Sequence, residues 1–276
     1  MRPAAVLALL VSAGLAACGS VRPPAGAGVL PEGVLIAHAL GGIEGADYTN
    51  SLEAAESSYD AGRRWFEVDL TVTADGGVVA FHPGHEPRLD TDTSVRKMTT
   101  AQFLEHRYDG RFTTTSFRRL LELVARAGDT YVVTDTKWWT PWILRAVRHD
   151  VLAAPAVAPR VIPQIYRPAD LALLETARRD WSFPFVIFTL YQTKMSDAEI
   201  LAFVDTAHIP VVAASTGRFT PALAAALHAR GVRVLVHTVN RRADVEKLTR
   251  EGADGFYTDF YFPPPQRSPG VDRAAR

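Results

Sequence analysis

Residues 232–260, VRVLVHTVNRRADVEKLTREGADGFYTDF, decide the fold class because they predict a strand, a helix and a second strand. The runs at 232–240 and 255–260 are rich in valine, aromatic and threonine residues, which favour strands. Residues 241–251 between them carry a charged helical pattern. A crossover helix between two strands is the repeating unit of a parallel sheet.

The same alternation runs through most of the chain. Strand-like runs begin near residues 34, 64, 130, 160, 183, 209, 232 and 255, and helical segments separate them. These runs are almost continuously apolar, as in strands that are covered on both faces. Eight such units predict an α/β fold of the TIM (β/α)8 barrel type over residues 34–262. An open doubly wound sheet is the alternative, and because no helical pattern follows Phe260, the last helix is expected to be incomplete or missing.

Composition limits the function classes. The chain has 276 residues, of which 47% are apolar, enough for a large core. Thirty basic and thirty acidic residues give a formal charge of zero. A protein without net positive charge does not attract nucleic acid over its whole surface. We therefore expect no nucleic-acid partner, and anions should bind only at local sites.

The N-terminal residues resemble a bacterial export signal. Residues 1–18, MRPAAVLALLVSAGLAAC, place one arginine before an apolar run that ends at Cys18, the only cysteine. The segment LAACG (15–19) resembles a lipobox, which predicts a lipidated Cys18 and a membrane-anchored protein facing outside the cytoplasm; a plain cleaved signal is the alternative. Residues 19–33 are rich in proline and glycine and predict a tether, and residues 263–276 predict a flexible tail.

Two acidic residues interrupt an apolar strand in FEVDLTVTADGGVVAFHP (66–83). Glu67 and Asp69 are two positions apart, so both side chains point to the same side of the strand. His82 ends the strand that returns after the turn. In a barrel, the C-terminal ends of the strands form the mouth where chemistry occurs. A half-exposed hairpin with solvated acids is the alternative.

Asp135 and Lys137 repeat this spacing in TYVVTDTK (130–137). Together with Glu67 and Asp69, Asp135 would give three carboxylates from two strands, and oxygen ligands favour Mg²⁺ or Ca²⁺ over zinc. Such an ion would bind an anionic substrate, most simply a phosphate, with Lys137 adding a positive charge at the phosphoryl oxygens. A buried Asp135–Lys137 ion pair without a metal is the alternative.

Histidines occur near the same strand ends. His38 lies late in the first strand, and together with His82 it could supply a general acid and a general base. His85 could replace His82 in that role, and His237 either lines the site or fills the core. Strand-end residues expected to line a pocket are Gln164, Tyr166, Thr189 and Tyr191, whereas Asp259 and Asn240 are expected to be structural.

In order along the chain, these motifs resemble those of the glycerophosphodiester phosphodiesterase family, within the phosphatidylinositol-phospholipase-C-like TIM barrels. The matching segments, from about Val34 to Phe260, are AHALGG, TNSLEA, EVDLTVTADGGVVAFHP, DTK, HTVN and GADGFYTDF. The resemblance implies that His38 and His82 are the acid–base pair. It also implies that Glu67, Asp69 and Asp135 bind the metal and that Lys137 faces the phosphate.

The chain departs from the family pattern at several of these positions. Ala39 stands where the family usually has arginine, and Thr49 where it has glutamate. Asp135 replaces a glutamate, as in the related sphingomyelinase-D-like phospholipases, and His237 replaces a tryptophan. Losing the arginine removes a bidentate phosphate contact, which His237 could partly replace.

The resemblance therefore implies a metal-dependent phosphodiesterase that acts on glycerophosphodiesters or related phospholipid headgroup esters. Two other functions remain open from the residues. A surface lipoprotein could keep the pocket only to bind phospholipid headgroups, and a barrel glycosidase could use Glu67 and Asp135 without a metal. The glycosidase leaves His38, His82 and Lys137 unexplained.

Overall fold

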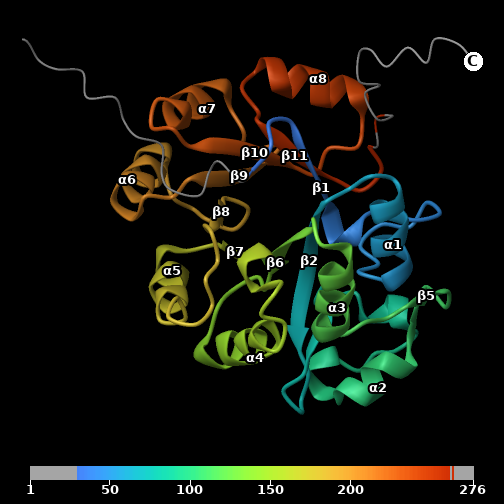
Figure 1. Cartoon of the computed structure of the whole chain (residues 1–276). Coiled ribbons are helices and arrows are strands. Elements are labelled where there is room, and N and C mark those ends of the chain that lie inside the picture. Colours follow the sequence, from blue (N-terminus) through green and yellow to red (C-terminus); the bar gives the residue numbers. More distant parts are fainter. Residues whose placement is uncertain (1–29, 262, 264–276) are drawn as a thin grey trace, which may run out of the picture.

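Eight parallel strands close into a barrel in the computed structural model, which describes residues 30–261 and 263 (Figure 1). Strand β1 (Val34–Ala37) pairs with both β2 (Trp65–Val72) and β11 (Gly255–Thr258), which closes the ring. Between β2 and β11 the ring contains β6 (Tyr131–Asp135), β7 (Val161–Ile165), β8 (Ile187–Thr189), β9 (Val211–Ser215) and β10 (Arg233–His237). The TIM barrel predicted from the sequence is confirmed.

Helices surround the strands (Figure 1). They are α1 (Leu52–Asp60), α3 (Phe117–Ala127), α4 (Pro141–Leu152), α5 (Pro168–Glu175), α6 (Asp197–Ala207), α7 (Pro221–His228) and α8 (Arg242–Arg250). Several begin at a serine or threonine whose hydroxyl accepts a backbone N–H of the first turn, as Ser116 does for α3 and Thr220 for α7. Within the described residues no helix follows β11, as the sequence predicted.

Side chains alternate between the barrel interior and the helix layer along β2. Phe66 and Val68 belong to the apolar cluster that includes the helix faces, whereas Trp65 belongs to a separate inner cluster. That inner cluster includes Ile36, and the other members are Leu30, Val34, Val133, Ile162, Phe185, Ile187, Val211, Ala213, Leu235 and Tyr257. Because the side chains of Glu67 and Asp69 point to the same side of β2 as Trp65, they lie inside the barrel. They are closer than the inner apolar cluster to the C-terminal ends of the strands.

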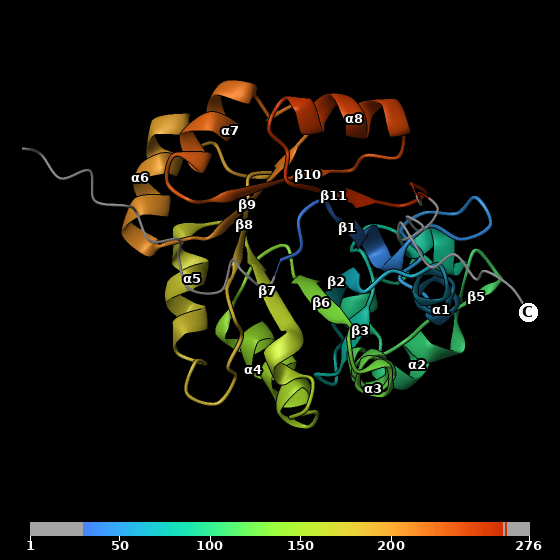
Figure 2. The ribbon, with the colours of Figure 1, turned by 45° about the horizontal axis from the view of Figure 1, so that its top comes forward.

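An ordered insertion covers one side of the barrel next to β2. Strand β3 (Val78–Ala80) pairs antiparallel with β2, which confirms the predicted return strand. Residues 84–116 are polar and poorly periodic in sequence, yet they form α2 (Thr100–Glu105) and a hairpin of β4 (Arg107–Tyr108) and β5 (Phe112–Thr113). Figure 2 shows β5 of this insertion beside α1.

The insertion has its own small core, which the sequence pattern did not reveal. Buried Phe81, Leu89, Val95 and Phe103 pack there with further apolar side chains. Leu89 and Val95 stand singly among polar residues, so this part of the chain shows neither a helical nor a strand period. The predictions for residues 1–29 and 264–276, including Cys18, lie outside the described residues. Among the residues that are described, no helix has both the length and the apolar character needed to cross a membrane.

Candidate active site

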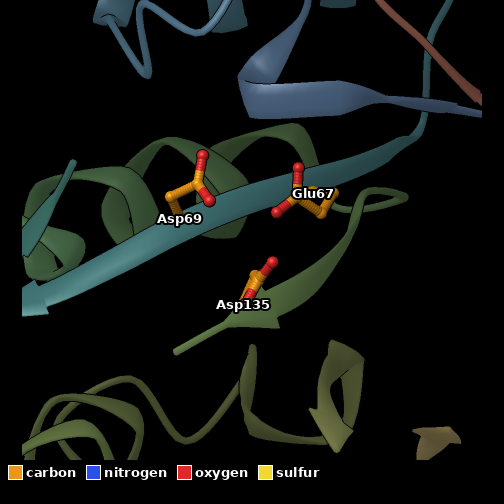
Figure 3. Close-up of side chains that lie close together, drawn as sticks. All are labelled: Glu67, Asp69 and Asp135. Atoms are coloured by element: carbon orange, nitrogen blue, oxygen red, sulfur yellow. The ribbon is translucent and has the colours of Figure 1, made fainter. Parts of the chain in front are cut away.

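Three buried carboxylates meet where the middle of β2 runs beside the C-terminal end of β6 (Figure 3). Ligand atoms of Glu67, Asp69 and Asp135 all lie within 4.8 Å of one another. Asp69 is the direct partner of Asp135 in the parallel register of the two strands. The structure therefore brings together all three predicted metal ligands, and because they are buried, the solvated-hairpin alternative for Glu67 and Asp69 is wrong.

Neighbouring groups hold the carboxylates in place. The side chain of Asn50 pairs with Asp69 twice, since its Nδ2 donates to Oδ2 at 3.0 Å and its Oδ1 accepts the backbone N–H of Asp69 at 3.0 Å. The backbone N–H of Ala39 donates to Glu67 Oε2 at 2.8 Å, and the Tyr166 hydroxyl donates to Asp135 Oδ2 at 2.7 Å. Glu67 Oε1 is buried and has no hydrogen-bond partner among the described residues.

Lys137 lies within this cluster. Its Nζ donates to Asp69 Oδ1 at 2.7 Å and to Asp135 Oδ2 at 2.8 Å, so the ion pair considered from the sequence is present. When all three carboxylates are ionised, this single ammonium leaves two negative charges uncompensated.

The pKa values of the two acids on β2 reflect this imbalance. Burial and the charge of Asp69 raise the pKa of Glu67 to about 8. Burial alone would also raise the pKa of Asp69, but Lys137 and the two histidines lower it to about 2.

His38 is held by a carboxylate that the sequence analysis expected to be structural. Its Nδ1 donates to Asp259 Oδ1 at 2.8 Å, and its Nε2 lies 3.9 Å from Glu67 Oε2. Burial alone would lower the pKa of His38, but the hydrogen bond to Asp259 and the charge of Glu67 raise it to about 9. Asn240 Nδ2 donates to the other Asp259 oxygen at 2.8 Å. Asp259 and Asn240 therefore orient a predicted catalytic side chain.

His82, rather than His85, lines the cavity at the barrel mouth. The Nδ1 of His82 lies 2.9 Å from the carbonyl of Pro83, which can only accept a hydrogen bond, so Nδ1 carries a proton and, in the neutral ring, Nε2 is the acceptor. His85 stacks on His82 with 4.5 Å between ring centroids, and its Nδ1 is hydrogen-bonded to Tyr108 at 2.8 Å. His85 thus supports the ring of His82 from outside the cavity.

The cavity has a volume of about 90 Å³. It is lined by His38, Tyr48, Glu67, His82, Asp135, Lys137, Gln164, Tyr166, Thr189, Tyr191, His237 and Tyr257. The four strand-end residues expected from the sequence, Gln164, Tyr166, Thr189 and Tyr191, are all among them. A larger cavity of about 410 Å³ lies between α1 and α3, but mostly apolar side chains line it and none of the predicted site residues does.

His237 lies at the cavity wall with a buried Nε2 that has no hydrogen-bond partner among the described residues. Burial and the positive charge of His38 lower the pKa of His237 to about 4. A neutral ring can exchange one hydrogen bond with a ligand, but it does not restore the charge of the missing arginine. At that arginine's position Ala39 is fully buried and contributes only its backbone N–H to Glu67.

Comparison with known proteins identifies a family whose sequence model matches this chain. Residues 42–261 match the sequence model of the glycerophosphoryl diester phosphodiesterase family. No curated protein matches the chain. Among solved structures, a candidate glycerophosphoryl diester phosphodiesterase from Silicibacter pomeroyi is 25% identical, with a TM-score of 0.64 over 85% of this chain and 92% of that one.

Two further structures share the fold at lower identity. An Oleispira antarctica phosphodiesterase, solved in complex with the product sn-glycerol-3-phosphate, is 17% identical with a TM-score of 0.64 over 83% of this chain and 94% of that one. A glycerophosphodiester phosphodiesterase from Thermotoga maritima is 19% identical with a TM-score of 0.65 over 83% of this chain and 95% of that one.

Proposed function

Because this chain belongs to the glycerophosphoryl diester phosphodiesterase family and is a phosphoric diester hydrolase, we propose that it cleaves glycerophosphodiesters with a divalent cation and two histidines. The observation that carries the proposal is the buried carboxylate cluster beside His38 and His82 in one cavity. A glycosidase would need neither histidine, and the family match favours a phosphodiester substrate over a glycoside.

The carboxylate cluster fits the divalent cation on which enzymes of this family depend. Glu67 Oε1 lacks a partner among the described residues although it is buried, and Lys137 pairs directly with only two of the three carboxylates, Asp69 and Asp135. A buried unpaired charge is costly, so a doubly charged ion with oxygen ligands would balance this site. Glu67, Asp69 and Asp135 would hold the ion, Mg²⁺ or Ca²⁺, and it would stabilise negative charge on the phosphoryl oxygens.

The hydrogen bonds of the two histidines suggest different roles for them. His82 has a free Nε2 acceptor, which suits it to remove the proton from the attacking hydroxyl or water. His38 is stabilised as an imidazolium by Asp259, which suits it to protonate the departing alcohol oxygen. Attack would be in line at phosphorus, so the two rings would act on opposite sides of the phosphoryl group.

Lys137 and His237 are the remaining candidates for phosphate contacts. Lys137 lines the cavity and carries a fixed positive charge, because Asp69 and Asp135 hold its pKa above the ordinary lysine value despite its burial. It can therefore attract the phosphoryl oxygens while still touching the carboxylates. His237 would add a neutral hydrogen bond from the opposite wall.

A panel of phosphodiesters tests this function and its substrate class. It should include glycerophosphodiesters, lysophospholipids, sphingomyelin and bis(p-nitrophenyl) phosphate, each assayed with Mg²⁺ and with Ca²⁺. Released alcohol and any cyclic phosphate are followed together, because a neighbouring substrate hydroxyl would give a cyclic product and water would not. His38→Ala should abolish turnover, and His106→Ala, on the insertion, is the control. Headgroup binding without turnover under saturating metal would contradict catalysis.

We also propose that the protein is exported and anchored in the membrane through a lipid on Cys18. Support for this comes only from the sequence of residues 1–18, in which the sole cysteine directly follows the apolar run. Labelling of cells with a radioactive fatty acid should mark the wild-type protein and not Cys18→Ala. Equal labelling of both, or of neither, would contradict it.

A further inference from the structure

Ala39 and Thr49 are two of the positions at which the chain departs from the family pattern, and neither side chain faces the cavity at the barrel mouth. Ala39 has no polar side chain and is fully buried. Thr49 is also buried, and its hydroxyl is 3.0 Å from the hydroxyl of Ser51, the residue that caps α1. Neither side chain is therefore available to a substrate in the cavity.

Tyr48, the neighbour of Thr49, lines that cavity instead. Its ring packs edge-on against His38, with 4.5 Å between centroids, and against His82, with 5.4 Å. A third edge-on contact, at 5.3 Å, joins it to His85. The tyrosine thus touches both proposed catalytic rings, and its hydroxyl forms no hydrogen bond within the described part of the chain.

The backbone around Tyr48 holds the ring in this position. Tyr48 has a φ of 51° and Asn50 a φ of 48°, a left-handed conformation that asparagine tolerates but that is unfavourable for tyrosine. The paired hydrogen bonds between Asn50 and Asp69 keep this turn against the carboxylate cluster. Such conformations persist where the surrounding structure requires them, and they are common at functional sites.

We propose that Tyr48 is a substrate-contacting residue whose hydroxyl donates a hydrogen bond to a non-bridging oxygen of the phosphoryl group held between His38 and His82. The inference rests on the proposed phosphodiesterase function and names a further group that would bind the phosphoryl oxygens. Burial raises the pKa of the Tyr48 hydroxyl well above its usual value, so it remains a donor. The ring itself keeps the two imidazoles in place.

Two substitutions separate the hydroxyl from the ring. Tyr48→Phe keeps the edge-on contacts and removes only the donor, and a hydrogen bond to a charged group is worth about tenfold to a hundredfold in kcat/KM. Tyr48→Leu removes the ring as well and should lower kcat further. Tyr131→Phe is the matched control, because Tyr131 stacks on Trp65 at the opposite end of the barrel.

Turnover of sn-glycero-3-phosphocholine and binding of inorganic phosphate are measured for all four proteins with saturating Mg²⁺. We expect Tyr48→Phe to lose about tenfold to a hundredfold in kcat/KM and to bind phosphate more weakly, with the melting temperature unchanged. Values equal to those of wild type and Tyr131→Phe would overturn the role of Tyr48. If the wild-type protein shows no turnover, the proposed function fails, and calorimetric phosphate binding still decides on Tyr48: weaker binding by Tyr48→Phe supports it, and equal or absent binding refutes it.

Discussion

The Asp259 carboxylate stabilises the protonated form of His38, so Asp259→Asn should change the pH dependence of turnover. Asn240 Nδ2 donates to Asp259 Oδ2 at 2.8 Å. The side-chain amide of Asn240 cannot flip to exchange its oxygen and nitrogen, because its Oδ1 already accepts the N–H of Asp259 at 2.7 Å and that of Phe260 at 3.0 Å. An asparagine at 259 would therefore place its oxygen toward Asn240 and its NH₂ toward His38.

This orientation sets the size of the effect. In the native protein, His38 has a pKa of about 9, and as an acid it works only while protonated, so activity should fall as the pH rises through that value. In Asp259→Asn, an NH₂ group faces Nδ1 and disfavours the imidazolium. Losing a charge-assisted hydrogen bond costs about 1.5–3 kcal/mol, and one pKa unit is about 1.4 kcal/mol. The fall in kcat/KM at high pH, the basic limb of the pH profile, should therefore occur about one to two pH units lower than in the wild type.

The assay is a pH profile of kcat/KM on a glycerophosphodiester, with metal held saturating at every pH. Asp254→Asn is the control, because Asp254 pairs with His228 in an exposed His–Asp pair, at 2.9 Å, that does not line the cavity. We expect the basic limb of Asp259→Asn to move and that of Asp254→Asn to stay. If kcat/KM of Asp259→Asn falls at the same high pH as that of the wild type, the acid role of His38 is refuted.

Four further changes test other parts of the site and the core. Asn50→Ala removes the hydrogen bonds that hold the carboxylate of Asp69 in place and should weaken metal binding about tenfold to a hundredfold, measured by calorimetry. Lys137→Met removes the ammonium that competes with a cation, so metal should bind more tightly while kcat falls at least about tenfold. Glu67→Gln should raise the metal concentration needed for half-maximal activity, seen in a Mg²⁺ titration. Ile36→Ala, in the fully buried inner cluster, should lower the free energy of unfolding by about 2–5 kcal/mol, measured by urea denaturation.

The barrel could be predicted from the sequence because each strand is an apolar run with its own helix. The apolar runs also made the acidic residues conspicuous, because charged groups inside a buried strand need partners. These residues are Glu67, Asp69 and Asp135. The insertion could not be predicted, because Leu89, Val95 and similar residues occur singly and reveal their common core only when the chain is folded.

The residues that support the histidines were also hidden. Asp259 contacts His38 across 221 positions of sequence, and nothing in a single strand-end aspartate distinguishes a partner for a histidine from a structural acid. Nothing in the sequence indicated that Tyr48 lies in the site, because its position between two histidines depends on a left-handed turn. The sequence offered one clue to Asp259, because this residue directly follows the last strand and His38 directly follows the first, and the ends of these two strands meet when the barrel closes.

The claim on which the other proposals depend is that Glu67, Asp69 and Asp135 bind one divalent ion that turnover requires. Its most direct test returns Mg²⁺ or Ca²⁺ stepwise to chelator-treated protein while bound metal and alcohol release are measured in the same samples. We predict no release from the metal-free protein and a rise in activity that is complete at one ion per chain. Full activity in samples that contain no bound metal would contradict the claim.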